Sequence, residues 1–158
     1  MKRILSFVGI LMIILIANIS MAQSKSAFYE AMAGNSAKAI DAQLSRLDSY
    51  ASGNEKLALE GALEMRKAGL LSIPAKKLST FKQGHKKLEA AIASAPRNGE
   101  FRFLRLMIQE NAPRSMGYSK NIGEDSKLIR EQFASLPAET RQSIKNYSKK
   151  SKSLGELL

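Results

Sequence analysis

Residues 99–110, GEFRFLRLMIQE, contain the pattern that decides the fold of this chain. Apolar side chains occupy nearly every face of a helix drawn through the stretch. The polar strip consists only of Arg102, Arg105 and Gln109, at spacings of three and four residues. A helix that is apolar nearly all round is buried by its neighbours. The stretch therefore predicts a central helix wrapped by other helices.

Helical periodicity extends from this stretch towards both ends of the chain, and no stretch is typical of a strand. The pattern predicts helices around Phe28 and Met32 and over residues 37–51, 54–69, 74–95, 122–133 and 137–148, with a structured loop over 111–121. We therefore expect an all-α fold, a compact array of about six or seven helices packed as antiparallel hairpins.

Local features predict where these helices begin and how they pack. Ser36 and Asn54 are the expected N-caps of two successive helices. Gly61 lowers helix propensity by about 1 kcal/mol, which indicates that another helix approaches closely there. In the helix that follows Pro74, we expect one apolar stripe to be buried, formed by Leu78, Phe81, His85, Leu88 and Ile92.

Two stretches resemble known families. Gly84, Leu88, Ala91 and Pro96 resemble the spacing in the second half of a tetratricopeptide repeat, where small residues let paired helices approach closely. This resemblance implies tetratricopeptide-like (TPR-like) helical hairpins. Residues 102–113, RFLRLMIQENAP, are similar to small exported helical proteins of uncharacterised function from Gram-negative bacteria, a likeness that implies no chemistry.

The N-terminus has the three parts of a secretory signal peptide. Lys2 and Arg3 provide a positive start, residues 4–16 are almost wholly apolar, and small residues precede a cleavage site between Ala22 and Gln23. We expect cleavage there and export, so that the protein is periplasmic or secreted. The alternative is an uncleaved N-terminal helix that anchors the chain in a membrane.

Composition limits the rest of the chain. The 158 residues include no cysteine, and 25 Lys and Arg against 14 Asp and Glu give a formal net charge of +11, or +9 once Lys2 and Arg3 are removed. Without disulfides or thiolate ligands, the hydrophobic core must stabilise the fold. The expected organisation is a signal peptide over 1–22, a helical domain over 23–148 and a basic C-terminal tail over 149–158.

Known catalytic and metal-binding motifs are absent from the sequence, so we expect no enzyme, no metal and no cofactor. The only histidine, His85, falls on an apolar stripe and is interpreted as a core residue. Glu110, Glu124 and Asp125 flank the 111–121 loop and could form a catalytic carboxylate pair. We favour a simpler interpretation, exposed acids at helix ends, with Glu124 and Asp125 near a helix start.

The two arginines of the central helix need a partner, because an unpaired buried charge is strongly unfavourable. The favoured interpretation is that Arg102 and Arg105 form ion pairs with Glu60, Glu64 or Glu110. The alternative is a cleft in which an anionic ligand is held by the candidate ligand-binding residues Arg102, Arg105, Gln109 and Glu110. The same region, with the 111–121 loop, is where an enzyme of unfamiliar type would have its site.

Lysines gather on one predicted helix and near the C-terminus. The candidate contacts for an anionic surface are Lys76, Lys77, Lys82, Lys86 and Lys87, with Lys145, Lys149, Lys150 and Lys152 further along the chain. We do not expect nucleic acid as a partner, because the chain has no recognition motif and no aromatic residues among these lysines.

The sequence predicts an exported, non-enzymatic helical protein that serves as a periplasmic protein- or peptide-binding module. The first alternative is a basic binder of anionic envelope lipid or glycan, and the second is an enzyme with an unrecognised site. No oligomeric state and no particular partner are predicted.

Overall fold

The structure is a computed structural model that describes residues 25–113 and 116–155. Every regular element within these ranges is a helix, so the predicted all-α fold is confirmed. None of the described helices is long and apolar enough to cross a membrane. The predicted signal peptide, residues 1–22, lies outside the described residues.

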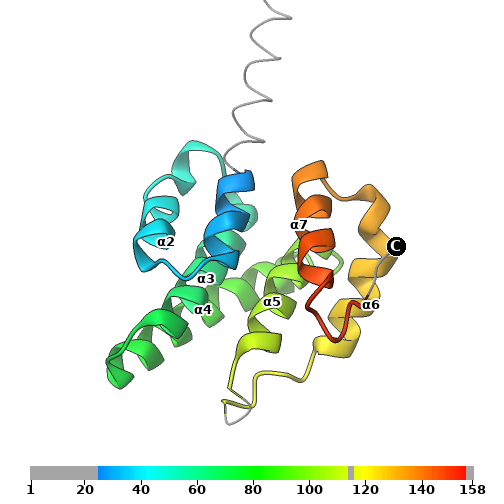
Figure 1. Cartoon of the computed structure of the whole chain (residues 1–158). Coiled ribbons are helices and arrows are strands. Elements are labelled where there is room, and N and C mark those ends of the chain that lie inside the picture. The colour runs from blue at the N-terminus through cyan, green and yellow to red at the C-terminus, as the bar shows by residue number, and fades with distance from the viewer. Residues whose placement is uncertain (1–24, 114–115, 156–158) are drawn as a thin grey trace, which may run out of the picture.

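The helices follow one another with short connections. Residues 25–33 are the first helical segment of the described residues, called here the first helix, and the later elements are α2 (Ala37–Leu44), η1 (Leu47–Ser49), α3 (Gly53–Leu70), α4 (Pro74–Ser94), α5 (Gly99–Asn111), α6 (Ile122–Gln132), η3 (Phe133–Ser135) and α7 (Ala138–Ser148). Figure 1 shows α3 and α4 as a long pair on one side of α5, with α6 and α7 on the other side.

The central position predicted for residues 99–110 is confirmed. Every residue of α5 from Gly99 to Gln109 is buried, and Phe103, Leu104 and Leu106 are completely buried. Asn98 caps the helix, because its side-chain oxygen accepts hydrogen bonds from the backbone nitrogens of Glu100 and Phe101 at 3.0 and 3.1 Å.

Two glycines bring α3 and α4 into close contact. A Cβ atom on Gly61 would lie 2.6 Å from the carbonyl oxygen of Gly84 and 2.7 Å from the backbone nitrogen of Leu88. A Cβ atom on Gly84 would lie 2.5 Å from the carbonyl oxygen of Gly61 and 2.8 Å from the backbone nitrogen of Met65. The helices are therefore antiparallel, and the close approach expected at Gly61 is present.

The first helix is attached to the rest of the domain by a buried polar cluster. Glu100 accepts hydrogen bonds from the hydroxyls of Tyr29 at 2.7 Å and Thr140 at 3.0 Å, and it pairs with Lys25 at 3.0 Å. Burial, followed by the nearby Glu100 carboxylate, raises the pKa of the Tyr29 hydroxyl. These contacts connect the first helix to α5 and α7.

Two predicted helix limits are wrong. Ser36 caps α2 as expected, but α2 ends at Leu44 instead of continuing to Ala51. Ser45 donates a hydrogen bond to the carbonyl oxygen of Ala42, a local alternative to helical bonding, and the chain continues into η1. The next helix begins at Gly53, so residue 54 lies in its first turn rather than at its N-cap.

Most of the predicted basic tail, 149–158, is described, and it packs on the domain. Leu154 is completely buried and Ser151 is buried, while Lys149 and Lys152 are exposed. Arg130 of α6 donates a hydrogen bond to the carbonyl oxygen of Ser153 at 2.9 Å. Residues 149–155 are therefore part of the folded domain.

Candidate binding groove

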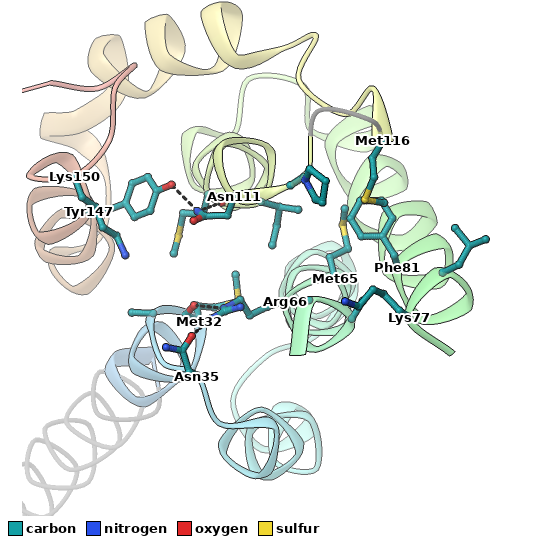
Figure 2. A pocket seen from close by; sticks show the side chains of 18 of the residues that line it. Met32, Asn35, Met65, Arg66, Lys77, Phe81, Asn111, Met116, Tyr147 and Lys150 are labelled. Carbon is teal, nitrogen blue, oxygen red and sulfur yellow. Dashed lines mark hydrogen bonds between the residues drawn. The ribbon is translucent and has the colours of Figure 1, made fainter. Parts of the chain in front are cut away.

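An apolar groove lies where the ends of several helices meet. Its volume is about 550 Å³, and its walls come from the first helix, α3, the start of α4, the end of α5 and the end of α7. Figure 2 shows the side chains from these segments around one open space. The groove is positioned by the α3–α4 contact and by the attachment of the first helix to α5.

All four methionines in the described part of the chain line this groove. They are Met32 in the first helix, Met65 in α3, Met107 in α5 and Met116 in the loop after α5. The first three are buried in the walls, and Met116 is 39% exposed. Methionine is flexible and polarisable, and it is frequent on surfaces that bind varied partners.

Large exposed apolar side chains also gather at the groove. Leu78 is 49% exposed and lines it, as does Met116, while Ile73 is 51% exposed and immediately precedes Pro74, another lining residue. The predicted burial of Leu78 in the α4 stripe is wrong, and Phe81 is only partly buried. This part of the stripe lines the groove instead of packing fully into the core.

An aromatic cluster holds the loop after α5 against α4. The Tyr118 ring lies edge-on to Phe81 and His85, with centroids 5.6 and 4.9 Å away, and its hydroxyl donates a 2.8 Å hydrogen bond to Glu89. Burial, followed by the Glu89 carboxylate, raises the pKa of Tyr118. The interpretation of His85 as a core residue is wrong, because its side chain is 43% exposed and stacks on Phe81 beside this loop.

The charged side chains that line the groove are all cationic: Arg66, Lys77 and Lys150. Arg66 is engaged within the fold, because it donates hydrogen bonds to the carbonyl oxygens of Met32 and Gly34. Lys77 on α4 and Lys150 after α7 are exposed and lie on opposite sides of the groove (Figure 2).

A second groove of about 520 Å³ continues between the first helix and α7. The two grooves share Ala33, Met107, Tyr147 and Lys150. The walls of the second groove include serine, glutamine, asparagine and glutamate side chains beside apolar ones. The two hollows adjoin at the residues that they share.

The candidate ligand-binding arginines are buried, but their partners are not those expected. Arg105 binds the carboxylate of Asp125 at 2.7 Å through both Nε and Nη2, and its Nη1 lies 2.8 Å from Glu89. Arg102 binds Asp125 at 2.9 Å and Glu124 at 3.1 Å. The expected ion pairs of these arginines with Glu60, Glu64 or Glu110 are therefore wrong.

Asp125 is completely buried, so its interpretation as an exposed acid at a helix start is wrong. Arg102 also donates two hydrogen bonds, through Nε and Nη2, to the carbonyl oxygen of Pro96. Every guanidinium nitrogen of both arginines thus has a partner within the protein. The cluster joins α4, α5 and α6, and it needs no external anion for electrostatic balance.

Gln109 and Glu110 do not join the arginines in one site. Gln109 is only 3% exposed, and no described residue hydrogen-bonds its side-chain amide. Glu110 instead accepts hydrogen bonds from the Ser153 hydroxyl and backbone nitrogen at 2.6 and 3.0 Å, and from Ser151 at 3.0 Å. Burial acts to raise the pKa of Glu110, but these hydrogen bonds outweigh it and leave the pKa below its usual value.

The five candidate lysines of α4 have different surroundings. Lys87 pairs with Glu60 at 2.7 Å and Glu64 at 2.6 Å on α3, and Lys77 lines the apolar groove. Lys76, Lys82 and Lys86 are exposed. Only part of the predicted cluster therefore forms an open cationic surface.

The chain matches no family model, no curated protein and no solved structure. The likeness to tetratricopeptide repeats therefore stays a prediction. No group of three or more His, Cys, Asp or Glu side chains within residues 25–113 and 116–155 is placed to hold a metal ion.

Sequence reasoning missed the groove residues Met32, Met65, Met107 and Met116. No local pattern indicates that these four residues meet, because Met65 lies within a predicted helix and Met116 within the predicted 111–121 loop.

Proposed function

We propose that this chain is an exported, non-enzymatic helical module that binds an apolar segment of another protein or peptide in the groove. The observation that carries the proposal is that all four methionines of the described residues come from four separate segments to line one groove. Exposed apolar side chains gathered in one place are typical of an interaction site. Export is supported by the sequence pattern of residues 1–22.

The groove fits a short apolar segment better than a reactive small molecule. Among the described residues, its lining contains no acid, no histidine and no serine or threonine hydroxyl, so these residues offer little for proton transfer or nucleophilic attack. Flexible methionines allow the walls to adjust to different side chains. Grooves between helices commonly bind an amphipathic helix through a few apolar anchors.

A second candidate function is contact with an anionic envelope lipid or glycan. It is favoured by Lys76, Lys82 and Lys86, which are exposed on α4 and have no carboxylate within 4.0 Å among the described residues. Attraction of this kind acts between exposed charges and weakens steeply with added salt. Binding in the apolar groove persists at high salt, which separates the two functions.

Selection from a phage-displayed library of random peptides, each about twelve residues long, tests the proposed function. The bait is protein expressed from the full-length sequence. The groove variant is Leu78→Glu/Met116→Glu, which adds charge at two exposed lining positions. The control is Ser79→Glu/Gln83→Glu, with the same change in charge at exposed α4 positions outside the groove.

We expect peptides with recurring apolar residues to be enriched by the native protein and the control, and their enrichment to disappear with the groove variant. Circular dichroism of each variant verifies that the helices are retained. Equal enrichment by the groove variant, or no enrichment by the native protein, would contradict the proposed function.

A further inference from the structure

We propose that the segment bound in this groove is acidic as well as apolar, with carboxylates that pair with Lys77 and Lys150. This inference rests on the proposed function and specifies the chemistry of the partner. A peptide with apolar anchors flanked by Asp or Glu fits the groove, and one flanked by Lys or Arg does not.

The charge at the groove is positive. Its described lining residues include Arg66, Lys77 and Lys150 but no Asp or Glu. Arg66 already binds two carbonyl oxygens of the chain and the side-chain oxygen of Asn35 at 2.6 Å. Of the three cations in the described lining, Lys77 and Lys150 are therefore those that a partner can reach.

Lys77 and Lys150 are among the lysines without a carboxylate nearby in the described residues, and they differ from Lys76, Lys82 and Lys86 in that they line the groove. Lys25, Lys56, Lys67, Lys87 and Lys127 each lie within 4.0 Å of a carboxylate. Within the described part of the chain, no carboxylate lies as close to Lys77 or Lys150. Lys150 instead lies over the Tyr147 ring, 5.2 Å from its centroid. A carboxylate of the bound partner can form the ion pair that these lysines lack within the described residues.

The polar groups in the groove walls favour a peptide over an anionic lipid. Asn111 donates hydrogen bonds through Nδ2 to the carbonyl oxygen of Met107 at 2.7 Å and to the Tyr147 hydroxyl at 3.0 Å. Its side-chain oxygen is available to accept a hydrogen bond from a ligand. Asn35 accepts from Arg66 through its oxygen, which leaves its Nδ2 group to donate. A peptide backbone supplies both a donor and an acceptor for these amides, whereas an acyl chain supplies neither.

The same random-peptide selection tests this inference with a second pair of variants. Lys77→Gln/Lys150→Gln removes the two charges at the groove. Lys82→Gln/Lys86→Gln removes two charges from exposed α4 positions outside it and is the matched control. Selected peptides are then synthesised with each Asp or Glu replaced by Asn or Gln, and their affinities are measured by fluorescence anisotropy.

We expect the native protein and the control to enrich Asp and Glu beside the apolar anchors. Amide replacement is expected to weaken binding about three- to tenfold, the range for two exposed ion pairs, and less at high salt. The Lys77→Gln/Lys150→Gln variant is expected to bind the acidic and amide peptides equally.

Apolar peptides selected without an acidic preference would overturn this inference and leave the proposed function standing. The absence of any groove-dependent peptide would overturn both. Binding to phosphatidylglycerol vesicles that is lost in Lys77→Gln/Lys150→Gln, without selection of peptides, would instead assign the groove to an anionic lipid.

Discussion

Replacing Gly61 by alanine is expected to destabilise the domain by about 2 kcal/mol. The new Cβ would lie 2.6 and 2.7 Å from backbone atoms of Gly84 and Leu88, which cannot rotate away as a flexible side chain can. The α3–α4 pair must therefore separate, and a gap of 0.5–1 Å already removes roughly a quarter to a half of the van der Waals attraction. Overpacking typically lowers the free energy of unfolding by about 1–3 kcal/mol, and the higher helix propensity of alanine offsets at most about 1 kcal/mol of that loss.

Urea unfolding followed by circular dichroism measures this change, and the thermal midpoint is expected to fall by roughly 5–10 °C. The control is Gly123→Ala in α6, where no described atom beyond the neighbouring residues and the helix's own backbone lies within 4 Å of the added Cβ. That variant is expected to be unchanged or more stable by up to about 1 kcal/mol. A Gly61→Ala protein at least as stable as the native protein would refute the close contact between α3 and α4.

Three further predictions concern the buried polar groups. Asp125→Asn is expected to lower the free energy of unfolding by roughly 3 kcal/mol or more in urea titrations, because it leaves two buried arginines without their shared carboxylate. Gln109→Met is expected to raise that free energy by about 1 kcal/mol, because it removes a buried amide that has no hydrogen-bond partner among the described residues; a loss of stability would indicate an unrecognised partner. The lowered pKa of Glu110 means that its ionised form stabilises the attachment of residues 151–154 at neutral pH, and that this contribution is lost as the pH falls through the lowered value. The protection factors of these residues, which correct for the intrinsic pH dependence of amide exchange, should therefore fall on acidification, and Glu110→Gln should abolish that change.

Sequence periodicity was sufficient to predict the helical fold because burial acts on whole helix faces. The stretch 99–110 is apolar on nearly every side, and only a surrounding layer of helices can remove it from water. It is harder to predict where a side-chain hydrogen bond to the backbone ends a helix. The apolar stripe continues past Leu44, yet the Ser45 hydroxyl bonds to a carbonyl oxygen of the preceding turn and the α-helix ends there.

The partners of the buried arginines could not be predicted in the same way. The sequence indicates that Arg102 and Arg105 need a carboxylate, but the nearest acids on neighbouring helices were equally plausible. Their shared partner, Asp125, lies across a loop whose path depends on how Tyr118 packs against α4. Such a contact is determined by the assembled helices rather than by any local pattern.

The groove was missed for a related reason. An apolar stripe indicates which face of a helix packs against the protein. It does not show whether other helices cover the whole length of that face. Leu78 belongs to the same stripe as Leu88, yet the first is half exposed and the second is completely buried. The difference arises because the start of α4 lines the groove, whereas Leu88 packs against α3 beside Gly61.

The most direct test of the proposed function is methyl NMR of protein labelled with carbon-13 at its methionine methyl groups, titrated with acidic amphipathic peptides of about twelve residues. We expect the signals of Met32, Met65, Met107 and Met116 to shift together, and the shifts to be lost in Leu78→Glu/Met116→Glu for the three methionines that remain. Peptide binding that leaves all four methionine signals unchanged would contradict the assignment of this groove as the binding site.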